Sequence, residues 1–269
     1  MLPTIPFLLS ALSVLLVSQT GDPAPALPSG EEVLARFVAA TGGQAAHDRI
    51  ENRVTLGILS MEGGRVRLPL KSIKAKPARS HSRDELPGLG PRERGATAEV
   101  AWERSALVGT MVYEGLERAE LLRQAVFDRY VYWRTVWKEV ECVGTKEVDG
   151  EVCYELAMTP KAFDETELRP GAAPEPNRAC FSQKTGLLVM FTLLVPSVGG
   201  PPVVTEVHQS MYRKVDGILL PFRVEQRIEG HPPGVTEIHT IQHNVLLLPS
   251  QFALPAEVRK IVDERRRGG

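Results

Sequence analysis

Alternating apolar and polar residues predict an antiparallel sheet through the second half of the chain. After the Asp216-Gly217 pair, Leu220, Phe222 and Val224 alternate with charged side chains. This alternation is typical of a strand with one face in a core and one in water. Asp-Gly also favours a tight hairpin turn, because both central residues take positive φ. Strands are predicted at 137–144, 151–159, 178–183, 187–195, 203–213, 219–229 and 235–245.

The predicted strand 187–195 differs from the others because both of its faces are apolar. Such a strand must be covered on both sides. We expect a core on one side, and a helix or an apolar ligand on the other.

The first half of the chain predicts helices before and after a set of strands. Ser29 with Glu32 forms a capping-box pattern, which opens an amphipathic helix closed by Gly42-Gly43. A short helical piece follows at 44–50, and strands begin at Val54, with a turn at 62–64. Pro69 in the returning strand favours an edge position or an irregularity. Apolar residues at helical spacing predict a helix over 115–132, and 254–262 ends in a short helix before a basic tail.

These elements predict a mainly β (α+β) fold, with a strongly curved antiparallel sheet, or incomplete β-barrel, and one or two helices packed on its concave side. The domain organisation that we expect is a signal peptide at 1–26 and a single domain at 27–269. Within that domain, 160–177 is predicted to be a mobile loop and 263–269 a tail.

Residues 1–26 have the pattern of a secretory signal. The apolar run 5–17 is too short to span a membrane, and cleavage is predicted after Gln19 or Ala26. No Lys or Arg precedes the run. The missing basic residue departs from a typical signal, but the length and position of the apolar run predict export to the periplasm, with an uncleaved inner-membrane anchor as the alternative.

The net charge bears on possible ligands, and the cysteine positions bear on possible disulfides. The 269 residues include 32 basic and 33 acidic side chains, a net charge of -1 that gives no electrostatic reason to expect nucleic acid. In the register set by Asp149-Gly150, Cys153 faces Lys146 and Cys142 faces Ala157. Cys142 and Cys153 are then roughly 13 Å apart along the strands, too far for a disulfide. Cys153 and Cys180 are the better pair, and the alternative is that all three cysteines are small apolar core residues.

Neither catalytic nor metal chemistry emerges from the motifs. His239 and His243 are four apart in a strand context, roughly 13 Å along the chain, which is too far to share a metal. Residues 80–84 contain Ser, His and Asp, but neighbours on a strand point to opposite faces and cannot form a catalytic triad. We therefore expect no catalytic residue, no metal and no cofactor.

Aromatic residues concentrate after the predicted helix. Five of them fall within eleven residues: Phe127, Tyr130, Tyr132, Trp133 and Trp137. One interpretation is that they pack the helix on the sheet. The other is that they line an apolar pocket, with the helix as its cover.

Several segments along the chain together form a recognisable pattern. They are 34–43, Ala101-Trp102-Glu103, 121–125 with Phe127, Val143-Gly144 with Val148-Asp149-Gly150 and Cys153-Tyr154, 184–189, Tyr212-Arg213 with 215–218 and Leu220-Pro221, and His243-Asn244-Val245 with Phe252. In these segments, over about residues 30–260, the chain resembles a group of exported bacterial proteins similar to the outer-membrane lipoprotein-sorting proteins (LolA/LolB-like).

The resemblance implies an incomplete, curved barrel plugged by helices, which carries acyl chains of lipoproteins in its apolar cavity. The chain departs from the family pattern in the loop 160–177, in Ser182-Gln183, and in its basic tail.

The leading hypothesis is a non-enzymatic exported carrier or sensor, a monomer, that binds a lipid, acyl chain or lipoprotein between the sheet and the 115–132 helix. Transient membrane contact and another envelope protein are further expected partners. One alternative is a structural or interaction module of the envelope with a filled core. Another is an enzyme with scattered acidic residues, which would need Asp and Glu side chains converging in one cleft. The predicted ligand-binding residues are Phe37, Trp102, Leu122, Val126, Phe127, Tyr130, Trp133, Trp137, Val189 and Phe191.

Overall fold

The computed structural model describes residues 26–161, 176–197 and 200–268. The predicted signal peptide and most of the predicted loop 160–177 lie outside the described residues.

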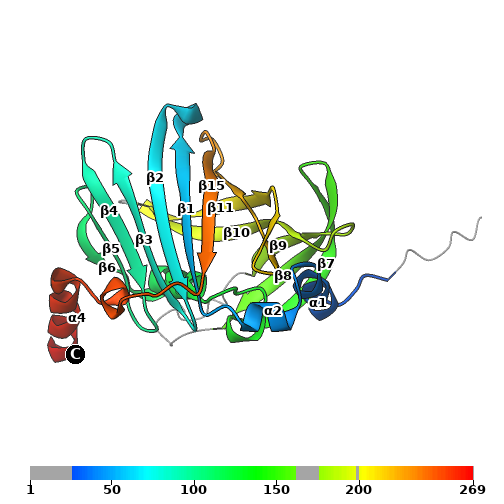
Figure 1. Ribbon diagram of the computed structural model, residues 1–269, viewed down its shortest axis with the longest axis horizontal. Helices are drawn as coiled ribbons and strands as arrows, with labels where there is room; N and C mark the ends of the chain where they lie inside the picture. The colour runs from blue at the N-terminus through cyan, green and yellow to red at the C-terminus, as the bar shows by residue number, and fades with distance from the viewer. Residues whose placement is uncertain (1–25, 162–175, 198–199, 269) are drawn as a thin grey trace, which may run out of the picture.

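One 13-stranded antiparallel sheet forms the body of the protein (Figure 1). Its strand order is β6-β5-β4-β3-β2-β1-β15-β14-β11-β10-β9-β8-β7, so that β6 and β7 are its edges. The strands are β1 (Asn52–Met61), β2 (Val66–Ala75), β3 (Arg79–Leu86), β4 (Gly90–Ala96), β5 (Ala101–Ser105), β6 (Gly109–Val112), β7 (Trp137–Val148), β8 (Glu151–Pro160), β9 (Asn177–Ser182), β10 (Leu188–Ser197), β11 (Gly200–Ser210), β14 (Arg223–Arg227) and β15 (Gly234–His243). The predicted curved, mainly antiparallel architecture is confirmed.

Helices cover the sheet at several places. α1 (Gly30–Ala40) begins at the predicted capping box, in which the Glu32 N–H donates to Ser29 Oγ at 3.2 Å. It packs on β7, and the short α2 (Gln44–Asp48) follows it. α3 (Gly115–Ala125) contacts β10, β4 and β5, so it bridges the two halves of the curved sheet. α4 (Ala256–Gly268) contacts the edge strand β6.

The predicted helix 115–132 is wrong at its C-terminal end, because α3 stops at Ala125. There the chain leaves the helix to pair with the sheet: Val126 bridges to Ala78, and the Phe127 N–H donates to Pro77 O at 3.0 Å. Asp128 then takes a positive φ of 45°. Helical spacing in the sequence continues past this point, but the backbone hydrogen bonds do not.

The Asp216-Gly217 turn is confirmed, but the strands around it are shorter than predicted. β12 (Arg213–Val215) and β13 (Ile218–Leu220) form a separate two-stranded sheet. The long strand is interrupted at Met211, whose φ is 55°, and the Phe222 N–H turns back to Ser210 O. A hairpin projects from the sheet as a result, instead of two continuous long strands.

The predicted register of β7 and β8 is confirmed near the turn, where Lys146 pairs with Cys153. A bulge between Cys142 and Gly144 shifts it further on, so that Cys142 pairs with Leu156 and not with Ala157. All three cysteines are free, and Cys153 and Cys180 are fully buried. Their role is therefore that of small core residues.

Two further predictions concern Pro69 and the C-terminal basic residues. β2 is an interior strand, although β3 pairs with it only from Leu70 onward, which leaves Pro69 at a local edge on that side. The basic residues predicted as a tail belong to α4. Arg265 lies 3.1 Å from Glu114, and Arg266 lies 2.9 Å from Glu99.

Candidate binding site on the concave face

Strand register defines the face of the sheet that the helices cover. Paired residues of neighbouring antiparallel strands lie on the same face. Arg53 pairs with Lys74, and Lys74 Nζ donates to Gln124 O of α3 at 2.9 Å, so these side chains lie on the α3 side, called here the concave face. Following the register across the sheet places five half-buried apolar side chains on the same face: Leu59, Leu70, Leu193, Val224 and Ile238.

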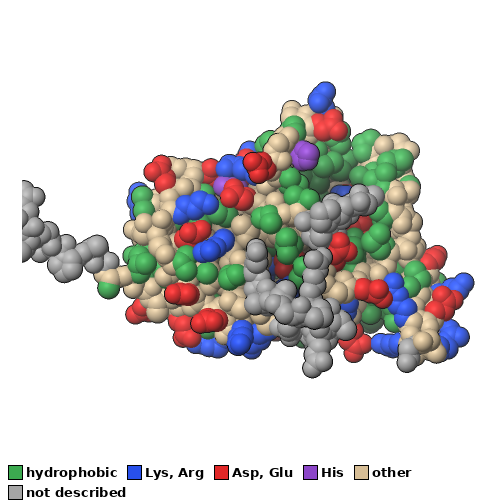
Figure 2. All heavy atoms as spheres, turned by 180° about the vertical axis from the view of Figure 1, so that it is seen from behind, with side chains coloured by type: hydrophobic (Ala, Val, Ile, Leu, Met, Phe, Trp, Pro, Cys, Tyr) green, Lys and Arg blue, Asp and Glu red, His purple; other side chains and the backbone are tan. Residues whose placement is uncertain are grey.

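These five residues, called here the apolar strip, come from five strands: β1, β2, β10, β14 and β15. Figure 2 views the molecule from behind and shows hydrophobic side chains around a hollow over the strands that Figure 1 draws at the left. Leu193 and Val224 also pack on the main buried cluster. The strip therefore connects solvent with the core of the curved sheet.

An aromatic cluster fills the concave face at the other end of the sheet. Tyr130 stacks on Trp137 with ring centroids 5.0 Å apart, and contacts Phe191 at 5.7 Å, Phe181 at 5.9 Å and Phe37 at 6.3 Å. Stacked and edge-to-face ring contacts stabilise beyond the area that they bury. Burial raises the pKa of Tyr130 to about 12, so its phenol stays neutral at physiological pH.

The structure brings six of the ten predicted ligand-binding residues together. Phe37, Val126, Tyr130, Trp133, Trp137 and Phe191 belong to or pack on the main cluster. Leu122 packs α3 on β4 and β5, close by on the same face. Phe127 lies instead beneath the β12–β13 hairpin, with Ile218 and Leu220.

The remaining two predicted residues lie on the opposite, outer face. Trp102 pairs with Gly95 out of phase with the concave residues, and packs on Val258 of α4. Val189 belongs to a cluster with Cys153 and Cys180, because a bulge in β10 between Leu188 and Met190 turns it outward. Trp102 is covered by α4 and Val189 is turned outward by the bulge, so neither residue belongs to the concave face.

Most charges near the concave face form ion pairs. Asp84 lies 2.8 Å from Arg92, Asp128 lies 2.8 Å from Arg53, and a buried Glu120–Arg123 pair within α3 is 3.2 Å long. Such pairing offsets the cost of removing charges from water.

Lys74 and Arg129 are different. Neither has an ion-pair partner within the described parts of the chain. The Arg129 guanidinium lies over three aromatic rings instead, 4.9 Å from the centroid of Phe191, 5.2 Å from Tyr130 and 5.8 Å from Trp137. Desolvation, together with the charges of Arg129 and Arg53, lowers the pKa of Lys74 to about 8. Sequence reasoning missed both residues, although Arg129 stands inside the aromatic run, between Phe127 and Tyr130.

The lowered pKa of Lys74 makes a test possible. The folded pKa of about 8 is below the unfolded value of about 10.4, so the unfolded chain binds more protons between these values and stability rises with pH there. Lys74→Met is expected to raise the unfolding free energy by about 1–3 kcal/mol at pH 7, and by less at pH 10. Urea denaturation at both pH values measures this. The control is Lys71→Met, an exposed residue of the opposite face. A gain independent of pH would contradict the assignment.

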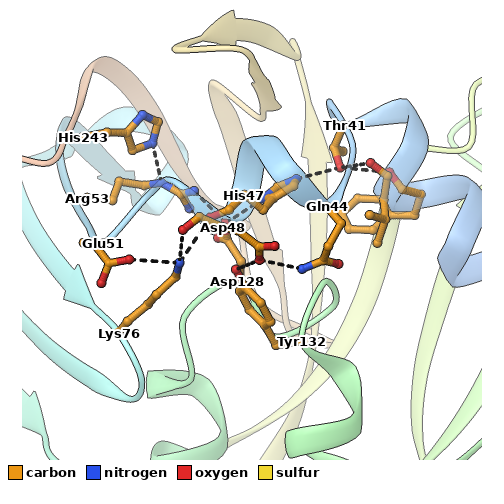
Figure 3. A network of polar contacts seen from close by, with 12 residues as sticks. Thr41, Gln44, His47, Asp48, Glu51, Arg53, Lys76, Asp128, Tyr132 and His243 are labelled. Atoms are coloured by element: carbon orange, nitrogen blue, oxygen red, sulfur yellow. Dashed lines mark hydrogen bonds and ion pairs between the residues drawn. The ribbon is translucent and has the colours of Figure 1, made fainter.

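A buried polar network fixes the segment that carries Arg129 (Figure 3). Asp128 accepts two hydrogen bonds from Arg53, at 2.8 and 3.0 Å, and its Oδ2 lies 3.0 Å from His47 Nδ1. Arg53 Nε also donates to His243 Nε2 at 3.0 Å. Burial alone would raise the pKa of Asp128, but Arg53 and His47 outweigh it and hold that pKa well below its usual range.

Asp128, His47 and Thr41 are the residue types of a catalytic triad, but the hydroxyl of Thr41 is buried and hydrogen-bonded to the backbone. His47 Nε2 lies 3.0 Å from Thr41 Oγ1, but the Thr41 hydroxyl donates to Phe37 O at 2.9 Å and the residue is 1% exposed. A nucleophile needs room for a substrate beside it. The network ties α1, α2, β1 and the Asp128 segment together. In the described ranges of the chain, no group of three His, Cys, Asp or Glu residues is placed to hold a metal ion.

Three solved structures share this architecture. A LolA superfamily protein from Nitrosomonas europaea has a TM-score of 0.54 and 12% identity, over 85% of this chain and 99% of that chain. A putative outer membrane lipoprotein-sorting protein domain from Vibrio parahaemolyticus has a TM-score of 0.51 and 10% identity, over 83% and 95%. The chain has the LolA-like fold. A DUF1329 family protein from Desulfovibrio piger is also similar, with a TM-score of 0.54 and 15% identity over 83% and 97%.

The LolA-like fold confirms the architecture that the sequence resemblance implied, and at these identities it shows the fold alone. No family model matches the sequence, and no curated protein matches it. Within the described residues, no helix is long and apolar enough to cross a membrane.

Proposed function

We propose that the protein is a non-enzymatic carrier or sensor that binds the alkyl chain of a lipid or lipoprotein on the concave face. It acts in the periplasm as a monomer, after export by the leader 1–26, and makes transient contact with membranes. The cluster of Phe37, Val126, Tyr130, Trp133, Trp137 and Phe191 forms the closed end of the site, and the apolar strip forms its open end.

The apolar strip is the observation that supports this proposal. Five half-buried aliphatic side chains from five strands share one face of an open sheet. Completing their burial with an alkyl chain would contribute about 0.8 kcal/mol for each methylene group removed from water. No polar motif is needed for such binding, which fits the lack of a catalytic or metal motif in the sequence.

A second candidate is an interaction module of the cell envelope that holds no ligand. The dense ring contacts around Tyr130 favour it, because side chains already occupy that end of the concave face. In this case the apolar strip would contact another envelope protein.

Chain-length dependence separates the two. Titrating the purified protein with octyl, decyl and dodecyl glucoside by calorimetry is expected to show affinity rising about fourfold with each added methylene. Leu193→Gln is expected to weaken dodecyl glucoside binding about fivefold, since about 1 kcal/mol of apolar contact is lost. The matched control is Leu107→Gln, in a turn, with 59% of that leucine exposed. No binding, or binding without dependence on chain length, would favour the interaction module.

A further inference from the structure

Two buried polar atoms in the described part of the concave interior have no hydrogen-bond partner: Trp137 Nε1 and Thr205 Oγ1. Trp137 is 3% exposed and Thr205 is fully buried. Leaving a buried polar group unsatisfied costs about 1–3 kcal/mol. Thr205 pairs with Leu193, which places its side chain on the concave face beside the apolar strip.

Two cations lie close to one another here: Arg129 contacts the aromatic cluster, and its charge bears on Lys74 of β2. Arg129 lies over the rings of Trp137, Tyr130 and Phe191, and one hydrogen bond of 3.5 Å joins it to the Tyr130 hydroxyl. A guanidinium has five N–H donors, so most of its donors are free of protein acceptors in the described residues. Lys74 uses one of its three donors on Gln124 O.

The surrounding charges do not neutralise these cations. The positive neighbours that lower the pKa of Lys74 are Arg129 and Arg53. Asp128 is the only negative neighbour that bears on Lys74 from the described residues, and it is already held by two hydrogen bonds from Arg53. The other buried carboxylate of the described residues that bears on this cluster, Glu120, is paired with Arg123 at 3.2 Å. Lys74, Arg53 and Arg129 against Asp128 therefore leave an excess of positive charge at the inner end of the apolar strip.

The geometry points to a binding site for an anionic single-chain amphiphile. Its head, a carboxylate or a phosphate monoester, accepts hydrogen bonds from Arg129, Lys74 and Trp137 Nε1, and its alkyl chain lies along the apolar strip. This inference rests on the proposed function and names the class of its ligand. Charge-assisted hydrogen bonds to such a head are stronger than neutral ones. A cationic head group would be repelled, because the Arg129 guanidinium already lies over the aromatic rings.

The head group can be tested with probes of one chain length. Dodecyl phosphate, dodecanol, dodecyltrimethylammonium and inorganic phosphate are titrated into the full chain at pH 7, with tryptophan fluorescence and calorimetry as readouts. Dodecyl phosphate is expected to bind at least about tenfold more tightly than dodecanol, because ionic hydrogen bonds contribute 1.4 kcal/mol or more. Inorganic phosphate, without a chain, is expected to bind far more weakly.

Variants then assign the effect to the two cations. Lys74→Met and Arg129→Gln are each expected to weaken dodecyl phosphate binding about tenfold and to change dodecanol binding less than about twofold. Lys71→Met, on the same strand but the opposite face, is expected to change neither. Lys74→Met is expected to fold at least as stably as the parent, so the test does not depend on the folding of Arg129→Gln.

Three results would overturn the inference: equal affinity for dodecyl phosphate and dodecanol, equal losses for both probes in the Lys74 and Arg129 variants, or inorganic phosphate binding as tightly as dodecyl phosphate. In the first two cases dodecanol binding still supports the proposed function. If no twelve-carbon probe binds at all, the proposed function fails with it.

Discussion

Asp128→Asn is expected to lower the free energy of unfolding by about 3–5 kcal/mol, because it leaves the buried charge of Arg53 without its carboxylate. Arg53 donates to both oxygens of Asp128, whose side chain is 9% exposed. An amide can accept at one position only, and it places an N–H group against the guanidinium. Urea denaturation at pH 7 measures the loss. The matched control is Glu139→Gln on β7, an exposed carboxylate, which should change stability by less than about 0.5 kcal/mol.

The pH dependence of the same variant gives a second readout. The folded pKa of Asp128 is depressed, so its contribution is present above the unfolded pKa of about 3.9 and is lost as pH falls through the folded pKa. The difference in unfolding free energy between the parent and Asp128→Asn should therefore be constant from pH 7 to about 5, and should narrow below about pH 4. A loss that stayed the same at acid pH would show that the Asp128 charge is not what stabilises this segment.

Periodicity predicted the fold because it depends on local patterns. The capping box at Ser29, the Asp-Gly turns and the alternating strands each have a signature within a few residues, and each is present in the structure. The prediction failed where a distant partner decides the outcome. Helical spacing continues past Ala125, but the Pro77 carbonyl and Ala78 capture the backbone at 126–127 and end the helix.

The candidate site could be predicted only in part for the same reason. Aromatic density identified Tyr130, Trp133 and Trp137, which do meet in one cluster. The sequence also predicts Trp102 as a ligand-binding residue, because local sequence does not show which face of a strand a helix covers. The helix that covers Trp102 is α4, more than 150 residues away along the chain. Lys74 and Arg129 could not be paired from the sequence, because their proximity arises only when α3 crosses the curved sheet.

Gly42→Ala is the second large effect, and it concerns the contact between the α1–α2 turn and the Asp216-Gly217 hairpin. Gly42 has a φ of 122°, and a Cβ there would come well inside van der Waals contact with Gly217 O. The neighbouring Thr41 O accepts the Leu219 N–H at 3.0 Å, so the hairpin cannot shift without losing that bond. Strain and forced displacement together are expected to cost about 3 kcal/mol or more, measured by urea denaturation.

Gly43→Ala is the matched control that separates backbone strain from the close approach. Gly43 has a φ of 83°, but a Cβ there would meet no heavy atom within 4 Å. It should therefore lose about 1–3 kcal/mol, the cost of holding an L residue at φ 83° and ψ 158°, a region that is essentially restricted to glycine. The loss of Gly42→Ala in excess of that of Gly43→Ala would measure how closely the hairpin docks on the turn. Equal losses would mean that the hairpin moves away from the added Cβ at little cost. The Asp216-Gly217 turn would then be stabilised by its own positive φ values and not by its contact with the α1–α2 turn.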